Sequence, residues 1–382
     1  MTEKLYDSDS FLKEFTATVL ESSQTADGYI TILDKTAFFP EGGGQPSDIG
    51  FLNDAKVYDV QISNGLIYHY TTKQFQKGQT VTGRLDFDRR FDFMQQHSAE
   101  HIVSGIAHNL FGCENVGFHL SRDIVTLDFD KPLNKEQLLK IEKIANKKVW
   151  ENVAFNCRYP DSETLKGLNY RSKKELEGEI RIVEIESTDT CACCAPHVKN
   201  AGQIGLIKLL DTEKLRGGIR IELKAGNRAL EDYNLKYENV KKISFALATS
   251  QNETALSVER LLQNMAEQKS EITALKHEKI KAAAESFNPE SLITAIFEDN
   301  LTVKDLQVFS DALHKAHGGI RAVFSETETG FAFAICGDDL DPFFQNFKAE
   351  FKIKGGGRNG MVQGTVQAEK TKLISFFNSV SI

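Results

Sequence analysis

Two short segments of the sequence place imidazole and thiol side chains at spacings that suit a metal ion. In the first, His97 and His101 are separated by three residues, so on a helix they lie one turn apart on one face. In the second, CACCAPH, the same spacing separates Cys193 from His197 in a tight proline-containing segment. Imidazole nitrogen and thiolate sulfur are typical zinc donors. These four residues therefore predict one Zn²⁺ site.

The cysteine segment leaves the identity of the sulfur ligand open. Cys191 and Cys194 flank Cys193, and only the three-residue spacing to His197 favours Cys193. Such clustering is typical of metal binding or reactive thiols rather than of a disulfide framework. HSAEH also matches the H-x-x-E-H pattern of inverted zinc proteases. That interpretation assigns no role to CACCAPH, and it requires a further carboxylate ligand. It is therefore disfavoured.

The elements that position these ligands follow from the hydrophobic pattern. Residues 1–90 are short β-branched and aromatic runs separated by Gly, Asn and Asp, which predict a small β-barrel or β-sandwich, with the barrel preferred. Residues 91–111 change to helical spacing, so the two histidines are expected on a helix. His119 then lies on an expected strand, from which it could point towards the metal site. Helices and strands mix up to residue 227, which predicts an α+β zinc-binding domain.

The second half of the chain begins with a long helical segment. Residues 228–286 are almost unbroken helix with an interruption near 250–252, and a 3-4 spacing of apolar residues runs over 258–279. Gln268 and Lys279 interrupt that spacing, so a helical hairpin and an intermolecular coiled coil both stay open. In the tail, helices are expected at 289–299 and 302–317, and KGGGRNGMVQGTV is expected as a glycine-rich loop. The expected fold class is α+β multidomain, with a barrel, an α+β zinc-binding domain, a helical linker and a C-terminal α/β domain at 1–90, 91–227, 228–287 and 288–382.

Length and charge restrict the function classes. The 382 residues suggest two or three domains. With 46 basic and 54 acidic side chains the net charge is −8, which excludes a basic surface over the whole chain; nucleic acid would need local basic patches. No apolar run is long enough for a membrane span, and the N-terminus lacks the pattern of a secretory signal. A cytoplasmic protein without membrane contact is expected.

The sequence resembles the editing domain of alanyl-tRNA synthetase and the free-standing alanyl-tRNA editing hydrolases of the AlaX type. The segments that carry the resemblance occur in one order: PEGGGQPSDIG, MQQHSAEH, GFHLSRDIVTLDFD, CACCAPHVKNAGQIGLIKLL and KLRGGIRIELKAGNRAL. KGGGRNGMVQGTV is similar to the GGG-containing C-terminal domain of the synthetase and of the longer editing proteins. Few residues precede the first strand and no Asp-His-His occurs, which disfavours a synthetase and a DHH phosphoesterase.

The resemblance implies a zinc-dependent aminoacyl-tRNA deacylase that hydrolyses Ser-tRNA(Ala) and Gly-tRNA(Ala). Its metal motifs map to His97 and His101, and to Cys193 and His197, although CCAPH departs from the family's Cys-Gly-Gly-Thr-His. Its GGGQ loop lies beside the editing pocket. There the side chain of Gln45 would form a hydrogen bond with the hydroxyl group of serine, which alanine lacks.

The other candidate roles concern water and tRNA. Glu100, beside His101 on the expected helix, is a candidate general base. Six basic and two acidic residues lie between Lys348 and Lys372, which suits phosphate binding. The expected substrate or tRNA contacts are Gly43, Gly44, His119, Arg216, Arg220, Lys354, Gly355, Gly356, Gly357 and Arg358. A homodimer through 228–287 is expected from the helical seam. The alternative is a non-catalytic tRNA-binding scaffold, because four protein ligands are the pattern of structural zinc.

Overall fold

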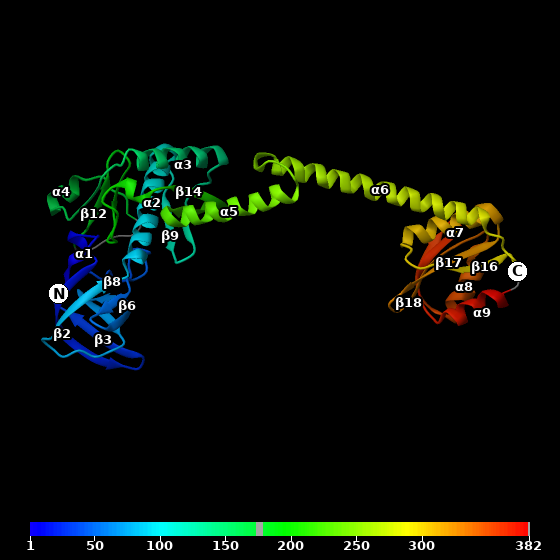
Figure 1. Cartoon of the computed structure of the whole chain (residues 1–382), viewed down its shortest axis with the longest axis horizontal. Helices are drawn as coiled ribbons and strands as arrows, with labels where there is room; N and C mark the ends of the chain where they lie inside the picture. The colour runs from blue at the N-terminus through cyan, green and yellow to red at the C-terminus, as the bar shows by residue number, and fades with distance from the viewer. Residues whose placement is uncertain (173–178, 381–382) are drawn as a thin grey trace. The chain divides into compact units, whose positions relative to one another are not determined.

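The computed structural model describes residues 1–172 and 179–380 and shows an α+β protein of two compact units, Met1–Lys241 and Lys242–Ile382 (Figure 1). Each unit contains hydrophobic cores of its own, which pack strands against helices. Across the described residues, every helix is too short or too polar to cross a membrane.

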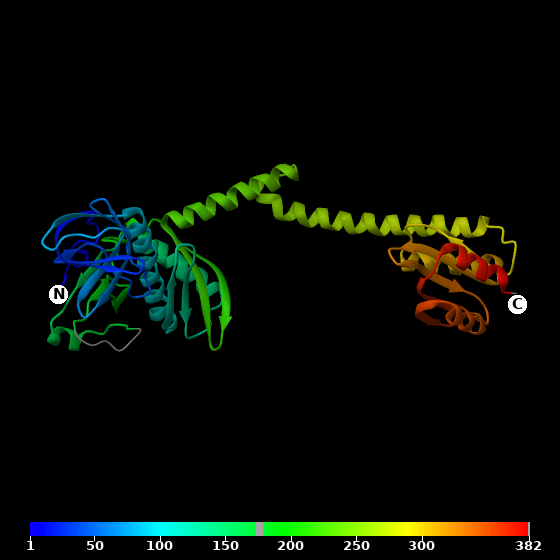
Figure 2. The same ribbon diagram turned by 90° about the horizontal axis from the view of Figure 1, so that it is seen from below.

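Strands at the start of the first unit close into a barrel in the order β2-β3-β7-β6-β5-β8 (blue in Figures 1 and 2). Neighbouring strands are antiparallel, and alternate side chains such as Leu33, Ile67 and Val81 fill the interior. A short helix, α1 (Leu5–Ser8), and the parallel pair of β1 (Glu3–Lys4) with β4 (Lys35–Thr36) adjoin it. The barrel strands are β2 (Glu14–Thr25), β3 (Gly28–Leu33), β5 (Gly50–Leu52), β6 (Ala55–Ser63), β7 (Leu66–Thr71) and β8 (Thr80–Leu85).

His69 on β7 is a fully buried histidine that makes the barrel sensitive to acid. Its Nδ1 donates to the Thr31 carbonyl at 3.0 Å, and its Nε2 lies 2.8 Å from Thr36 Oγ. Burial lowers the pKa of His69 from 6.5 to about 4, although the bond to Thr31 opposes that shift. Below pH 6.5 the unfolded chain therefore binds more protons than the folded chain, so stability falls as the pH falls towards 4.

We expect His69 to contribute about 3 kcal/mol less to the free energy of unfolding at pH 4 than at pH 7.5. Urea unfolding of the wild type and of His69→Gln across this range measures the contribution. The variant should lose that part of the pH dependence, whatever its stability at pH 7.5. Parallel pH profiles for the two proteins would contradict the prediction.

Helix α2 (Phe87–Phe111) is the central element of the first unit. It begins after Asp86, whose side chain accepts from Arg89 N at 3.2 Å, and it ends at Gly112 in the left-handed conformation, with φ 61°. Every side chain from Phe93 to Ala107 is buried, so this part of the helix has no solvent face. The helix therefore carries His97 and His101 into the interior.

Two sheets and a helix surround α2. A four-stranded sheet has the order β14-β15-β10-β9, and α2 packs on it together with α3 (Lys135–Trp150), which begins with a capping box of Asn134 and Gln137. A three-stranded sheet, β11-β12-β13, contacts α2 through β13. Short helical turns, α4 (Ser162–Gly167) and η1 (Ala201–Ile204), complete this region. The strands are β9 (Asn115–Leu120), β10 (Val125–Phe129), β14 (Ile207–Leu215), β15 (Gly218–Ala225), β11 (Phe155–Arg158), β12 (Ile182–Ile185) and β13 (Asp189–Ala192).

Long helices follow the first unit's sheets, and the second unit is built on a sheet of order β16-β17-β18-β20-β19. Helix α5 (Gly226–Ala246) ends near the expected interruption, η2 (Gln251–Glu253) follows, and α6 (Thr254–Ser286) continues as one helix (Figure 2). On one face, α6 and α7 (Val303–His317) cover Val323 and Ala334, whereas α8 (Leu340–Glu350) and α9 (Lys370–Ser379) cover the other face. The strands are β16 (Ile293–Phe297), β17 (Ile320–Thr327), β18 (Gly330–Cys336), β19 (Lys352–Arg358) and β20 (Met361–Gln367).

Two sequence-based expectations about the second unit are wrong. The helix expected at 289–299 is instead strand β16, because ITAIF pairs in parallel with β17. The glycine-rich loop is instead the hairpin of β19 and β20, in which Gly355, Gly356 and Gly357 are paired residues. Its turn is Asn359-Gly360, with φ values of 55° and 77°, as a two-residue hairpin turn requires. The division into four domains stays a prediction.

Candidate metal centre

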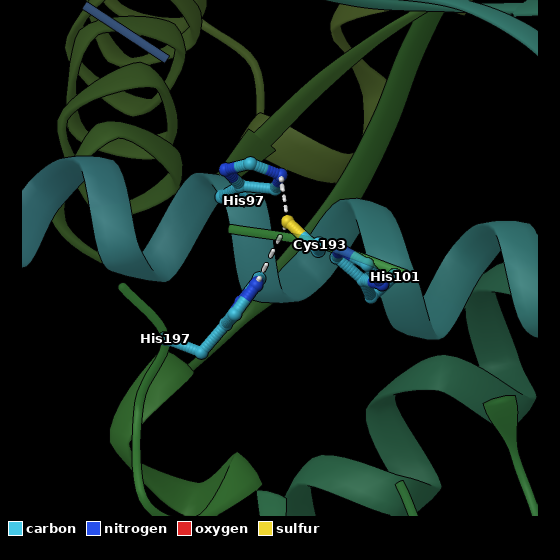
Figure 3. Close-up of side chains that lie close together, drawn as sticks. All are labelled: His97, His101, Cys193 and His197. Carbon is cyan, nitrogen blue, oxygen red and sulfur yellow. Dashed lines mark hydrogen bonds between the residues drawn. The ribbon is translucent and has the colours of Figure 1, made fainter. Parts of the chain in front are cut away.

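His97, His101, Cys193 and His197 lie together in the first unit, and their candidate ligand atoms all lie within 4.8 Å of one another (Figure 3). Cys193 Sγ lies 3.5 Å from His97 Nε2 and 3.4 Å from His197 Nε2. The imidazole of His101 lies with its ring centre 4.6 Å from that of His197 and 5.3 Å from that of His97. Residues almost a hundred positions apart in sequence thus form one cluster.

Local structure explains how the four side chains converge. The i, i+4 spacing puts His97 and His101 on the same face of α2, as the sequence predicts. Cys193 directly follows β13, and its amide donates to the Arg181 carbonyl at 3.0 Å. His197 follows in the same loop, where Ser98 of α2 holds it through a contact of 3.1 Å between Ser98 Oγ and His197 Nδ1.

The separations between ligand atoms in the cluster fit a tetrahedral zinc ion. With Zn–N near 2.0–2.1 Å and Zn–S near 2.3 Å, a tetrahedral site separates nitrogen from sulfur by about 3.6 Å. The two separations from Cys193 Sγ, 3.5 and 3.4 Å, match this value. Donor chemistry agrees, because three imidazoles and one thiolate suit Zn²⁺ better than Mg²⁺ or Ca²⁺.

The cysteine pKa shifts differ in direction. Burial by itself would raise the pKa of Cys193, but His97, His101 and His197 lower it well below 9.0, so its thiolate is favoured. Burial raises the pKa of Cys191, and burial together with the neighbouring Cys193 raises that of Cys194 to about 11. Because zinc binds thiolate, these directions favour Cys193 as the sulfur ligand.

The imidazoles are held in the tautomer that a metal ligand needs. His97 Nδ1 lies 3.1 Å from Gln45 Oε1, and His101 Nδ1 lies 3.3 Å from Asp189 Oδ2. With Ser98 beside His197, each Nδ1 therefore faces an oxygen, which in the neutral imidazole favours a lone pair on Nε2. Although burial opposes the shift, Cys191, Glu100 and Asp189 raise the pKa of His101 well above 6.5, so a metal at this histidine must displace a proton. Burial also lowers the pKa of His197 to about 3, so this histidine stays neutral at physiological pH.

A cavity of about 480 Å³ opens beside the cluster. Its lining includes the ligands His97, His101 and Cys193, the glycines Gly43 and Gly44, and Phe118. This volume is in the range of small-molecule sites. A substrate group in the cavity would therefore contact the metal ligands directly.

The glycine loop forms the wall of this cavity. Gly42 and Gln45 exchange backbone hydrogen bonds of 3.1 and 3.0 Å around a two-residue turn. Gly43 and Gly44 occupy this turn with φ of 61° and 82°, where side chains are strained. A Cβ on Gly44 would also lie 3.0 Å from Phe118, so the loop packs closely against the site.

Gln45 and Glu100, the two residues expected to act in the chemistry, are both buried beside the ligand cluster, and neither lines the cavity. Gln45 Nε2 has no hydrogen-bond partner among the described residues, whereas its Oε1 faces His97. Glu100 Oε1 accepts from Ser104 Oγ at 2.9 Å and from Asn115 Nδ2 at 2.6 Å, and its Oε2 lies 3.5 Å from His101 Nε2. The base role of Glu100 stays a prediction.

The expectation that His119 points towards the metal site is wrong. On β9 the side chains alternate, and Phe118 packs against His97 with ring centres 4.7 Å apart, so His119 is exposed on the opposite face. Arg216 lies exposed in the turn between β14 and β15, and Arg220 on β15 is paired with Asp128 at 2.7 Å. Neither arginine lines the cavity. Exposed residues Lys354 to Arg358 lie on β19 in the second unit.

Sequence reasoning missed Asp189 and Arg171. Asp189 accepts two hydrogen bonds of 2.8 Å from the Arg171 guanidinium and faces His101 with its Oδ2. A signal for Asp189 was present, because Asp189 and Cys191 alternate along one short strand and so share one face, and Cys193 directly follows that strand. Arg171 carries no such signal.

Comparisons with known proteins relate the chain to tRNA synthetases and to alanyl-tRNA editing proteins. A family model described as the second additional domain of threonyl and alanyl tRNA synthetases matches residues 180–222, and one for class II (A) tRNA synthetases matches residues 8–89. The alanyl-tRNA editing protein Aarsd1 of Bos taurus is 33% identical over 276 residues, which cover 67% of this chain and 62% of that protein. Its Mus musculus counterpart is 32% identical over 66% of each chain.

Alanine–tRNA ligases match over more of the chain. The ligase of Ignicoccus hospitalis is 28% identical over 97% of this chain and 42% of its own length. The chain thus spans about two fifths of these ligases and somewhat under two thirds of the editing proteins. In its matching models and relatives, the chain is similar both to alanyl-tRNA editing proteins and to alanine–tRNA ligases.

Proposed function

We propose that this protein hydrolyses the ester of mischarged Ser-tRNA(Ala) and Gly-tRNA(Ala) at a zinc centre formed by His97, His101, Cys193 and His197. The observation that carries the proposal is the cavity that opens directly onto the zinc-type ligand cluster. The editing role in the names of Aarsd1 relatives supports it. Water adds to the aminoacyl carbonyl, the bond from carbonyl carbon to ribose oxygen breaks, and that oxygen takes a proton.

The chain's own residues would bind and orient the ester. A zinc ion held by the four ligands would supply Lewis acidity at the wall of the cavity if it accepted a fifth ligand or released one of the four, and otherwise it would only position the ester. Gly43 and Gly44 leave room for the terminal adenosine beside that wall. Glu100 would accept a proton from the attacking water, with its carboxylate oriented by Ser104 and Asn115.

Discrimination against alanine would rest on Gln45. Its Oε1 faces His97, which fixes the amide orientation, and its unpartnered Nε2 donor lies buried behind the residues that line the cavity, so a shift of Gly43 and Gly44 would have to expose it. A serine hydroxyl would satisfy this buried donor, whereas an alanine methyl group would leave it without a partner. Glycine would be accepted because the space that the alanine methyl group fills would then admit a water molecule that accepts from Nε2.

The alternative is a tRNA-binding scaffold with a structural zinc ion, and one observation favours it. Four protein ligands complete a tetrahedral shell, as in structural zinc sites. Both proposals include tRNA contacts by the exposed basic residues of β19, Lys354 and Arg358, and by backbone groups of Gly355–Gly357. Arg216 and Arg220 would contact the acceptor end.

A deacylation assay separates the two functions. Zinc-loaded protein is incubated with Ser-, Gly- and Ala-tRNA(Ala), and released amino acid is measured. We expect serine and glycine to be released at least tenfold faster than alanine. Folded, zinc-loaded protein that binds the tRNA without releasing serine or glycine would favour the scaffold.

We also propose that α6 pairs with α6 of a second copy. Apolar side chains in heptad spacing are exposed on this helix: Val258, Leu261, Met265, Ile272 and Leu275 are 37%, 45%, 56%, 64% and 56% exposed. Coiled coils bury such a seam. Light scattering should give a dimer for the wild type and for Gln263→Glu, which lies on the opposite face, but a monomer for Leu261→Glu/Met265→Glu. A monomeric wild type at tens of micromolar would contradict this pairing.

A further inference from the structure

Asp189 and Arg171 form an ion pair that is built into the wall behind His101. Both Arg171 Nε and Nη2 donate to Asp189 at 2.8 Å, and the two side chains are 13% and 3% exposed. Backbone bonds fix the partner as well, because Arg171 N donates to Thr190 O at 2.9 Å and Ala192 N donates to Arg171 O at 3.0 Å. The pair is therefore bidentate, largely shielded from solvent and tied to β13 through the backbone of Arg171.

Close packing of α2 on β13 brings this pair to His101. Gly105 lies one helical turn after His101, and a Cβ there would approach Thr188 O to 2.5 Å and Asp189 Cβ to 2.7 Å. Asn109, a further turn along, donates to Thr188 O at 2.9 Å. The missing side chain at Gly105 thus lets the Asp189 carboxylate lie 3.3 Å from His101 Nδ1.

His101 differs from the other two imidazoles in the charge of its acceptor. His97 faces the amide oxygen of Gln45 and His197 faces the hydroxyl of Ser98, and both acceptors are neutral. Only His101, among the three, faces a carboxylate. A charged acceptor fixes the Nδ1–H tautomer more firmly and makes Nε2 a stronger donor to a metal.

We propose that Asp189, clamped by Arg171, is a positioning residue that holds His101 with its Nε2 directed at the metal. This inference rests on the zinc centre of the proposed function and adds two residues to it. Cys191 Sγ lies 3.0 Å from the same His101 Nδ1, so it is the competing acceptor. A thiol is a weak acceptor, and the carboxylate is the stronger partner.

The test measures zinc affinity by competition with a chromogenic chelator, without any tRNA. We expect Asp189→Asn to bind zinc 10–100-fold more weakly than the wild type, Arg171→Gln to show a smaller loss, and Cys191→Ala to change the affinity less than twofold. The matched control is Asp128→Asn. It breaks an Arg–Asp pair of similar geometry, with Arg220 at 2.7 Å, that contacts none of the ligands, so its zinc affinity should equal the wild type's.

A second measurement uses the metal-free protein. It stays informative when a variant is less stable than the wild type, provided that the variant is folded. Nitrogen-15 spectra of the imidazoles, recorded at a pH at which His101 is neutral, should show the Nδ1–H tautomer of His101 in the wild type and a mixture of tautomers in Asp189→Asn. Wild-type zinc affinity in Asp189→Asn, an equal loss in Asp128→Asn, or a loss in Cys191→Ala alone would overturn the proposal. A wild type without tight zinc binding would instead overturn the zinc centre itself, so the two failures are distinguishable.

Discussion

Replacing His97 with alanine is expected to weaken zinc binding about 100-fold and to reduce serine release to the background rate. Structural zinc sites contribute about 10–16 kcal/mol, so the loss of one ligand in four removes about 3 kcal/mol. His97 also contacts Gln45 and lines the cavity. Its loss therefore removes the metal and also disturbs the side-chain amide of Gln45, which would distinguish serine from alanine. Chelator competition and the deacylation assay on one preparation measure both effects.

His108 provides the control for this substitution. It lies on the same helix but is partly exposed and pairs with Glu114 at 2.7 Å, outside the ligand cluster. His108→Ala should keep the zinc affinity and the rate of the wild type. If His97→Ala bound zinc as tightly as the wild type, His97 would not be a ligand of the metal.

Arg90→Ala is expected to cost about 3–5 kcal/mol of the free energy of unfolding, because it leaves a buried carboxylate without its cation. The Arg90 side chain is completely buried in a pair with Asp48. It also donates to the carbonyls of Ala37 at 2.7 Å and Ser10 at 3.1 Å. Asp48 in turn accepts from Phe39 N at 2.6 Å, so the pair ties α2 to both ends of the glycine loop.

Urea unfolding at pH 7 measures this cost. Arg158→Ala is the matched control, because Arg158 and Glu184 form a pair whose side chains are 48% and 37% exposed, and such pairs contribute about 0–1 kcal/mol. We also expect Arg90→Ala to lower the deacylation rate, since the loop that carries Gln45 loses its anchor. A cost within 1 kcal/mol of the control would show that the barrel, rather than this pair, holds the loop.

The parts of the site that sequence could predict are those with local patterns. The i, i+4 spacing of His97 and His101 requires only a helix, and the apolar period around it predicts that helix. Cys193 and His197 carry their own spacing. That the two pairs lie together could be predicted from donor chemistry. Imidazole and thiolate groups at these spacings are typical zinc ligands, and one zinc ion takes four of them.

The parts that sequence could not predict depend on contacts distant in the chain. The side of β9 that faces the site is set by packing on α2, so Phe118 rather than His119 points inward. Asp189 meets His101 only because α2 and β13 approach each other closely at Gly105. Arg171 lies 18 residues before its partner and on no repeating pattern.

The errors in the second unit have similar causes. ITAIF is too short for its apolar residues to distinguish helical from strand periodicity. It forms a strand because it pairs with β17. In KGGGRNGMVQGTV the three glycines suggested a loop, whereas the Asn359-Gly360 turn sets a hairpin that pairs those glycines with β20. Turn chemistry outweighed glycine content there.

X-ray absorption spectroscopy of the zinc-loaded protein, with metal analysis of the same sample, tests the central claim most directly. The account predicts one zinc ion per chain with three nitrogen ligands at about 2.0–2.1 Å and one sulfur ligand at about 2.3 Å. Cys193→Ser should remove the sulfur contribution, whereas Cys194→Ser should leave it unchanged. A shell with two or more sulfur ligands, or a folded protein that retains no zinc, would contradict the centre formed by His97, His101, Cys193 and His197.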